Sequence, residues 1–241
     1  MEPILWGVSD QDANKPMMDT TSTDSPATDI ARISAVPAAR ATERTGPRRI
    51  FQALDRNASY PYTRRDYIRR MKWMLVQKTL FRFSPPRANR FRVWLLRKFG
   101  AKLAPTVVVR PTVTVFHPWL LEMGEWSCLG ERVTVYNLGP IVIGDHSTVS
   151  QNCHLCAGTH DWRDPAMPLI RSAIRIGSGV WVCADSFVGP NVCIGDNVIV
   201  GASSVVMKSV NADLIVAGNP ARTVCARPMV EPGGPGSGAA G

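Results

Sequence analysis

The sequence predicts an all-β fold in which very short strands wind into a prism of stacked coils, preceded by a basic helical segment. From Ile176 to Val206 an aliphatic residue returns at every sixth position. The residue two places earlier is also apolar or small, and the residue between them varies freely, which is the in–out–in alternation of a short strand. Turn-forming residues follow, as in "GDN" at 195–197. The aliphatic positions are Ile176, Val182, Val188, Ile194, Val200 and Val206.

These strands cannot pair as hairpins, because a three-residue corner would turn their inward side chains outward. A parallel β-helix, in which each coil stacks on the last, keeps the same side chains inside. Each rung buries little surface alone, so many rungs must stack. The same spacing extends upstream, at first regularly and then more raggedly, through Ile143, Val149 and Leu155 and through Leu103, Val109, Val115, Met123, Leu129 and Val135.

The two ends of the chain have the composition of disordered segments. Residues 1–59 are rich in Ser, Thr, Asp, Ala and Pro and show no apolar period, and residues 228–241 form a tail rich in Gly and Pro. The N-terminus lacks the features of a signal peptide, and no apolar run is long enough to span a membrane. We therefore expect a cytosolic protein whose six cysteines stay reduced.

Residues 60–102 hold all of the excess positive charge, with 13 lysine and arginine residues against one aspartate. Thr63 and Asp66 fit a capping box for a helix that carries Ile68, Met71 and Leu75 at helical spacing and stops at Pro85–Pro86. A second helix fits Ala88 to Phe99, with Gly100 as its C-terminal cap.

This basic segment has two candidate roles. In the first, the helices pack their apolar residues on the prism and leave their arginines in water. In the second, the segment contacts anionic lipid at the inner face of the cell membrane. No nucleic-acid recognition motif accompanies the charge, so we expect no nucleic-acid partner.

The repeat is interrupted between Cys153 and Gly177, just after His160. The alternation places Thr159 inward and His160 outward, and the next corner takes the twelve residues from Trp162 to Ala173 in place of three. A long loop beside an outward imidazole can form the wall of a pocket. The simpler alternative is a surface histidine beside a tolerated insertion.

Several motifs resemble those of the hexapeptide-repeat acyltransferases. "IGDNVIVGASSVVMKSV" and "VAGNPAR" resemble the family as a whole, and "VYNLGPIVIGDHSTVSQ" and "GTHDW" resemble its colanic acid and exopolysaccharide O-acetyltransferases. The resemblance covers roughly residues 66–227. It implies a left-handed parallel β-helix over residues 103–227, a homotrimer, and acetyl-CoA bound in the clefts between neighbouring prisms.

The resemblance also implies roles for single residues. His160 matches the general base, which takes the proton of a sugar hydroxyl as that hydroxyl attacks the thioester directly. Trp181 matches a tryptophan that shapes the active site. The other residues that match the acetyl-CoA site are Cys183, Ala184 and Ala202 along the pantetheine arm, with Ala184 as an oxyanion donor, and Lys208 and Arg222 near the phosphates. The family commonly has glycine where Cys183 stands. Asn137 and Asp161 are candidate contacts to the acceptor sugar, and Asp161 is also a candidate to orient His160.

Other functions of the same fold remain as alternatives. They are an antibiotic acetyltransferase, an N-acetyltransferase acting on a nucleotide sugar, and a zinc-dependent γ-type carbonic anhydrase. The zinc enzyme needs three converging histidines, whereas His154 and His160 are six residues apart and fall on different faces. Cys153 and Cys156 form one C-x-x-C pair without a second. We therefore expect no metal.

Counting strands around three faces gives a geometric expectation. It places His154, Trp181 and Ile199 in one outward ladder, and Val142, His160, Phe187 and Val205 in another, so that His160 lies against Phe187. Large apolar groups such as Trp181, Phe187 and Ile199 would be wet on a single prism. We expect them to face a neighbouring chain or a ligand.

Overall fold

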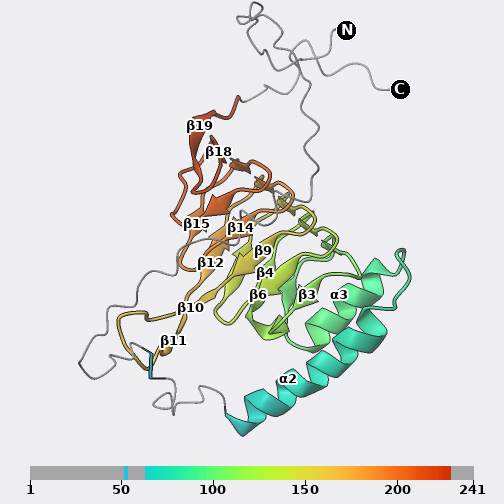
Figure 1. The fold of residues 1–241 in the computed structure, drawn as a ribbon. Helices are drawn as coiled ribbons and strands as arrows, with labels where there is room; N and C mark the ends of the chain where they lie inside the picture. The colour runs from blue at the N-terminus through green and yellow to red at the C-terminus, as the bar shows by residue number, and fades with distance from the viewer. Residues whose placement is uncertain (1–51, 54–62, 229–241) are drawn as a thin grey trace, which may run out of the picture. The chain divides into compact units, whose positions relative to one another are not determined.

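The computed structural model describes residues 52–53 and 63–228, in which three parallel sheets form a β-solenoid of about six turns (Figure 1). The remainder of the expected N-terminal extension and residues 229–241 lie outside the described residues. Face 1 contains β1 (Lys102–Leu103), β4 (Leu121–Met123), β7 (Ile141–Ile143), β12 (Ile174–Ile176) and β15 (Cys193–Ile194). Face 2 contains β2 (Val108–Val109), β5 (Cys128–Leu129), β8 (Thr148–Val149), β13 (Trp181–Val182), β16 (Ile199–Val200), β18 (Leu214–Ala217) and the antiparallel β19 (Arg222–Ala226). Face 3 contains β3 (Thr114–Val115), β6 (Thr134–Tyr136), β9 (His154–Cys156), β14 (Phe187–Val188) and β17 (Val205–Val206).

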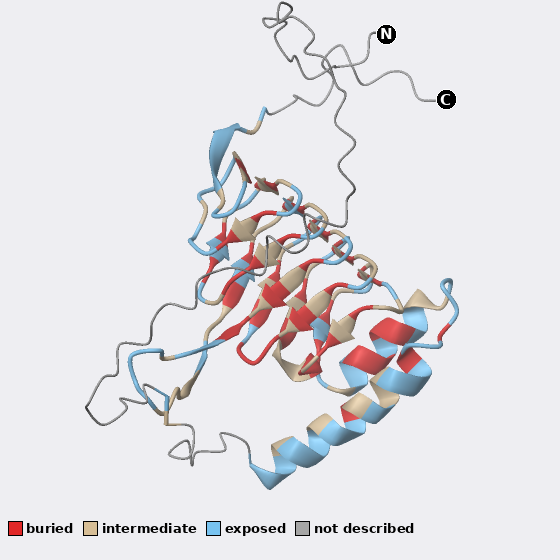
Figure 2. Ribbon diagram, in the orientation of Figure 1, coloured by how far each residue is buried: buried red, intermediate tan, exposed pale blue. Residues whose placement is uncertain are grey.

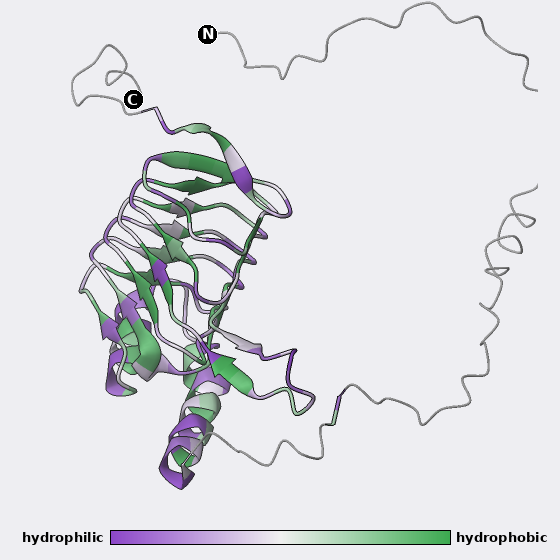
Figure 3. Ribbon diagram, turned by 90° about the vertical axis from the view of Figure 1, so that its left-hand side faces the viewer, coloured by the Kyte–Doolittle hydropathy of each residue, from purple (hydrophilic) through white to green (hydrophobic). Residues whose placement is uncertain are grey.

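The aliphatic positions of the repeat form the core of the solenoid, as the sequence predicts. Every one of them from Leu103 to Val206 is buried, and buried residues recur along the stacked strands (Figure 2). Viewed from another side, the stacked strands are predominantly hydrophobic (Figure 3). The upstream spacing is ragged because the early coils are longer. Lys102 pairs with Glu122, twenty residues on, whereas Arg175 pairs with Cys193, eighteen residues on.

The corners use asparagine and aspartate because one corner residue adopts a left-handed backbone. Asn152, Asp185 and Asn197 have φ of 59°, 61° and 56°, a region that these residue types tolerate better than most. Their side chains also link successive coils, since Asn152 Nδ2 donates to Asp185 Oδ1 at 2.8 Å. The turn formers therefore shape each corner and help to hold the coils in register.

A helical cap, residues 63–100, closes the first coil. It contains α2 (Arg64–Val76), a π-helical segment η2 (Gln77–Phe81) and α3 (Asn89–Lys98). The capping box between Thr63 and Asp66 is present, and these hydrogen bonds lower the pKa of the Asp66 carboxyl. Gly100 ends α3 at φ 98°, as expected. A short 3₁₀ helix, η3 (Pro118–Leu120), occupies a later corner.

The helical cap packs on the prism, as in the first of its two candidate roles, but not through the aliphatic residues named for α2. Ile68, Met71 and Leu75 do not pack on the prism but are exposed, by 55%, 44% and 67%. The side of α2 that faces the prism is anchored by Trp73, which is 1% exposed, and by Gln77. Because both residues bond to the backbone of the first coil, they fix which side of the helix is buried, and the aliphatic stripe points away.

Side chains of the cap replace the missing preceding coil. The hydrogen-bonding groups of the first strands point along the prism axis, and no strand precedes them in the described chain. Trp73 Nε1 donates to the Val115 carbonyl at 2.6 Å, and Gln77 Oε1 accepts from the Val115 N–H at 2.8 Å. Asn89 likewise donates to the Val107 carbonyl and accepts from the Val109 N–H. These backbone groups of Val107, Val109 and Val115 are thereby satisfied.

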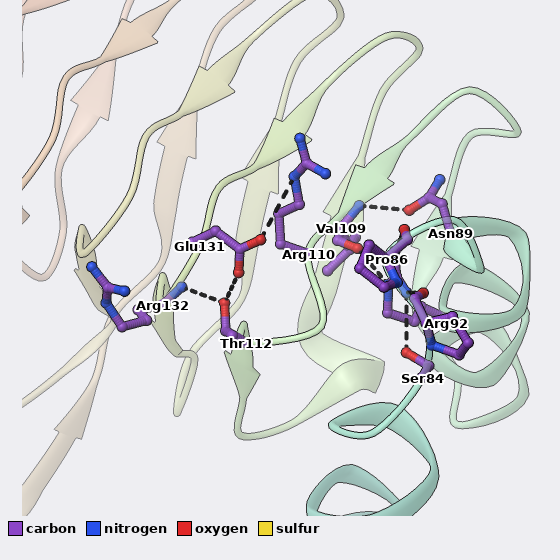
Figure 4. Close-up of polar contacts among 10 residues, drawn as sticks. Ser84, Pro86, Asn89, Arg92, Val109, Arg110, Thr112, Glu131 and Arg132 are labelled. Atoms are coloured by element: carbon purple, nitrogen blue, oxygen red, sulfur yellow. Dashed lines mark hydrogen bonds and ion pairs between the residues drawn. The ribbon is translucent and has the colours of Figure 1, made fainter.

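Arg92 is the most buried charge of the cap, at 1% exposure. Its guanidinium donates to the Val109, Pro85 and Pro86 carbonyls and to Ser84 Oγ (Figure 4). Burial lowers the pKa of Arg92, because desolvation disfavours the charged form. In the same view, the next coil is tied to the first by Glu131, which contacts Thr112 and Arg110.

Replacing Arg92 with alanine should lower the free energy of unfolding by about 2–4 kcal/mol, because it leaves the buried Val109 carbonyl and the part-buried Pro85 and Pro86 carbonyls without this donor. Urea unfolding would measure the change. Arg90→Ala is the matched control, since Arg90 is exposed on the same helix and should change stability by less than about 0.5 kcal/mol. Equal stability of the two variants would contradict the role given to Arg92.

Candidate active site

His160 lies on a two-stranded antiparallel hairpin that leaves the prism. The hairpin pairs β10 (Gly158–His160) with β11 (Leu169–Arg171), and His160 lies opposite Leu169. His160 Nδ1 is 2.6 Å from the Met167 carbonyl oxygen. A carbonyl only accepts hydrogen bonds, so Nδ1 carries the proton. Nε2 is then left with its lone pair, on an exposed ring, and this is the arrangement that a general base needs.

The hairpin is shaped by local hydrogen bonds. Asp161 Oδ1 accepts from the Arg163 N–H at 3.0 Å, and the Asp161 N–H donates to the Pro168 carbonyl. No hydrogen bond joins Asp161 to His160 in the described chain. The backbone carbonyl of Met167, rather than Asp161, orients the imidazole. Sequence analysis missed this role because a backbone carbonyl in a loop leaves no residue-type signal.

The hairpin overturns the expected count of faces. Thr159 is exposed rather than inward, and Asp161 is not a rung of the prism, because the chain leaves the prism before Gly158 and resumes at Ile174. Phe187 therefore pairs with His154 and not with His160. The hairpin replaces one strand of the expected count. Every strand after it therefore lies one face away from the face expected.

The corrected ladder places His154 among aromatic rings on the outer side of face 3. Its ring lies 5.4 Å from that of Phe187 and 6.1 Å from that of Tyr136. Burial lowers the pKa of His154, since the surroundings disfavour the imidazolium. Its Nε2 has no hydrogen-bond partner within the described chain. We expect His154 to be a neutral packing residue of this face.

Asn137 is fully buried and holds two coils together. Its Oδ1 accepts from the His117 N–H at 2.9 Å, and its Nδ2 donates to the His117 carbonyl at 2.6 Å. Both polar ends of the amide are therefore occupied by the backbone of the preceding coil. The contact of Asn137 with an acceptor sugar stays a prediction, and in this conformation the amide is engaged by the His117 backbone.

The residues matched to the wall of the active site and to the pantetheine arm lie on face 2 and at the corner that follows it. Trp181 is 49% exposed, donates from Nε1 to Ser150 Oγ at 2.9 Å, and pairs with Ile199 in an outward ladder. Ala184 and Ala202 occupy successive corners between faces 2 and 3. Neither N–H donates to another described residue, so both remain available to a ligand.

His160 and Ala184 lie at different corners of one prism. The hairpin of His160 leaves the solenoid where the chain passes from β9 on face 3 to β12 on face 1. Ala184 lies where the chain passes from β13 on face 2 to β14 on face 3. The width of face 3 separates the two corners, and a single chain does not bring them together.

Lys208 and Arg222, the two residues matched to the phosphate end, line the same pocket of about 510 Å³. The pocket lies among the last coils, between the segment after β17 and the antiparallel β19, and it does not include His160. The paired cations give this pocket the charge that a phosphate requires. The sequence gives no direct sign of this proximity, because fourteen residues separate the two cations in the chain.

The surroundings of the Cys183 and Cys153 thiols make them poor nucleophiles. Burial raises the pKa of Cys183, and it raises the pKa of Cys153 to about 11. A thiol of high pKa is a poor nucleophile at neutral pH, because little thiolate is present. Among the residues described, no group of three or more His, Cys, Asp or Glu side chains is placed to hold a metal ion.

Comparisons with known proteins bear on this geometry. The family model for the bacterial transferase hexapeptide, with six repeats, matches residues 173–208. The chain is 43% identical to a protein of Escherichia coli (strain K12) that is named colanic acid biosynthesis acetyltransferase WcaF. The match extends over 159 residues, which is 66% of this chain and 87% of that protein.

Two further proteins are similar at lower identity. Galactoside O-acetyltransferase of the same strain is 25% identical over 147 residues, which is 60% of this chain and 72% of that protein. A solved hexapeptide-repeat acetyltransferase of Vibrio cholerae, complexed with acetyl coenzyme A, superposes with a TM-score of 0.63 at 24% identity, over 69% of this chain and 91% of that one. The similarity to the Vibrio cholerae structure shows the fold alone.

Proposed function

The chain belongs to the hexapeptide-repeat acetyltransferases, and from this premise we propose that it transfers the acetyl group of acetyl-CoA to a hydroxyl of an exopolysaccharide or of its precursor. The observation that carries the proposal is the hydrogen bond from His160 Nδ1 to the Met167 carbonyl at 2.6 Å. It leaves Nε2 as the acceptor beside an extruded hairpin. The names of the relatives, which concern colanic acid and a galactoside, support a sugar hydroxyl as the acceptor.

The transfer is direct. His160 Nε2 takes the proton of the sugar hydroxyl while the hydroxyl oxygen attacks the thioester carbonyl carbon. The carbonyl oxygen becomes an oxyanion, to which the Ala184 N–H donates. The tetrahedral intermediate then collapses, the carbon–sulfur bond breaks, and the CoA sulfur takes the proton back from the imidazolium. The raised pKa of Cys183 fits a mechanism without an acyl-cysteine.

The donor lies along the prism in this proposal. Trp181 shapes the active site, and Cys183, Ala184 and Ala202 line the pantetheine arm. Lys208 and Arg222 bind the phosphates in the pocket among the last coils. Asp161 shapes the loop wall, and Asp161 and Asn137 remain the candidate contacts to the acceptor. The exposed Nε2 of His160 then meets the thioester end of the donor.

Each site is formed between two copies of the chain in a homotrimer. The separation of His160 from Ala184 by the width of face 3 supports this, because a neighbouring prism supplies the missing corner. The half-exposed Trp181 also gains a partner in such an interface. We place the enzyme in the cytoplasm, where acetyl-CoA is available.

The acceptor is tested by acetyl-CoA turnover against a panel of acetyl-free exopolysaccharide fragments, sugar nucleotides and aminated antibiotics. Release of the CoA thiol and mass spectrometry of the product would measure it. We expect an acetyl ester on a sugar hydroxyl, which mild base removes. An acetyl amide on an amino sugar or an antibiotic, which mild base leaves intact, would replace this proposal with one of the N-acetyltransferase alternatives.

A further inference from the structure

The helical cap presents a basic and apolar outer surface that nothing in the described chain covers. The bonds of α2 and α3 to the first coil fix their inner sides against the end of the prism, so their other sides face away from it (Figures 1 and 2). Of the fourteen large hydrophobic side chains that are exposed in the described residues, eight lie in this cap. They are Tyr67, Ile68, Met71, Leu75, Leu80, Phe83, Phe91 and Trp94.

The apolar residues form stripes at helical spacing. On α2, Ile68, Met71 and Leu75 follow one another on the outer side, three and four residues apart. On α3, the rings of Phe91 and Trp94 stack with centroids 6.0 Å apart, and Lys98 Nζ lies 5.8 Å from the Trp94 ring. An isolated exposed leucine needs no explanation, but a stripe on each of two helices marks an interaction surface.

Basic side chains flank both stripes. Eight of them are exposed and form no hydrogen bond or ion pair with the rest of the described chain. These are Arg64, Arg65, Lys72, Lys78, Arg82, Arg87, Arg90 and Lys98. The single acid between residues 60 and 102, Asp66, is committed to the N-terminal cap of α2.

We propose that the outer side of the helical cap docks on a membrane surface with anionic lipid headgroups, with α2 and α3 lying in the plane of the surface. Stable attachment of this kind requires two signals, buried apolar side chains and electrostatic attraction to anionic lipid, and the cap has both. Tryptophan at the interface and lysine or arginine near the headgroups are the residue types that such a surface uses. No helix in the described part of the chain is both long and apolar enough to cross the bilayer, so the contact is peripheral.

Charge favours lipid over a second copy of the chain. A two-fold interface would place the same patch on both partners, and these eight cations, which have no acid partner among the described residues, would face eight others. Anionic headgroups supply the opposite charge, and the acyl region takes the aliphatic and aromatic side chains. On the proposed trimer the caps lie at one end, so several would engage one membrane together. An acceptor anchored in lipid would then be presented to the enzyme in the same plane.

Flotation of the full chain with vesicles tests the proposal. Vesicles of phosphatidylcholine alone are compared with vesicles that also contain phosphatidylglycerol, at roughly 0.01 M and 0.15 M salt. We expect binding to the anionic vesicles at both salt concentrations and weak binding to the neutral ones. Lys72→Glu with Lys78→Glu should lower the affinity at least roughly tenfold. Leu75→Ser with Trp94→Ser should abolish the binding that survives at the higher salt.

The matched control is Trp126→Ser, since Trp126 is 64% exposed at a corner of the prism, outside the cap. It should bind vesicles as the unaltered protein does. Absence of binding to anionic vesicles at both salts would overturn the proposal, as would equal binding by the Lys72→Glu/Lys78→Glu variant. A fall in molar mass by light scattering for Leu75→Ser/Trp94→Ser would show instead that the surface joins copies of the chain. None of these measurements uses acetyl transfer, so membrane docking and the proposed activity can fail separately.

Discussion

Replacing His160 with asparagine should lower kcat/KM for acetyl transfer by at least ~10²-fold while the protein stays folded. The asparagine amide can still donate to the Met167 carbonyl, which His160 Nδ1 reaches at 2.6 Å, but it has no nitrogen lone pair to take the proton of the hydroxyl. The variant therefore removes the general base and keeps a hydrogen-bond donor to the Met167 carbonyl. Thiol release from acetyl-CoA in the presence of the acceptor measures the loss.

The control for this substitution is His146→Asn. His146 is also exposed, and it has φ of 53° at a corner, a conformation that asparagine accepts. We expect activity within a factor of about two of the unaltered enzyme, as for a surface substitution away from the site. If H160N retained more than about a tenth of the activity, the role of His160 as general base would have to be given up.

Mixing two inactive variants should restore activity if each site is shared between neighbouring chains. H160N lacks the base, and Ala202→Trp fills the cleft expected to hold the pantetheine arm, at a corner that is exposed in one chain. Either variant alone should have at most about a hundredth of the normal activity. In a ring of three with random mixing at equal amounts, about a quarter of the interfaces pair an intact histidine with an intact cleft, so about a quarter of the activity should return.

The mixing control combines H160N with His160→Ala, two variants that lack the same group. No interface in that mixture has an intact histidine, so no activity should return. Light scattering on the unaltered protein should give the mass of three chains. A monomer, or a mixture of H160N with Ala202→Trp that stays inactive after subunit exchange, would show that one chain forms its own site or that the cleft lies elsewhere.

Much of the fold could be predicted because each local signal has a single structural meaning. An aliphatic residue at every sixth position is compatible with three short strands per coil, and the buried positions from Leu103 to Val206 agree. The capping box at Thr63 and the glycine at position 100 likewise mark helix ends by mechanisms that act within a few residues. Longer-range relations do not enter such signals.

The errors arose where tertiary structure decided between equivalent patterns. The spacing of Ile68, Met71 and Leu75 indicates a helix but not which side faces the prism, and the bonds of Trp73 and Gln77 to Val115 settle that. Spacing also gives no sign of whether an interruption keeps or removes a strand position. The hairpin at Gly158 removes one, so Phe187 pairs with His154.

For the candidate site, the sequence selects residues by type and motif, and their roles stay predictions. His160 stood out because it precedes the break in the repeat, and the structure adds the tautomer through Met167. Asn137 carried the same kind of motif signal, and the structure adds that its amide bonds to the His117 backbone. An asparagine at a coil corner serves backbone or ligand equally well by chemistry, so only its surroundings could distinguish the two.

The side chains that satisfy the first coil also limit how far the solenoid can extend. An uncovered terminal coil presents a row of unpaired N–H and C=O groups, which would template the end coil of another molecule and then another, as a fibre grows. In this chain the groups of Val107, Val109 and Val115 are already bonded to Asn89, Trp73, Gln77 and Arg92. Because these partners are side chains of helices, they offer no backbone edge on which a strand of another molecule could pair. The prism therefore has a defined first turn, and growth from that end is blocked before it can begin.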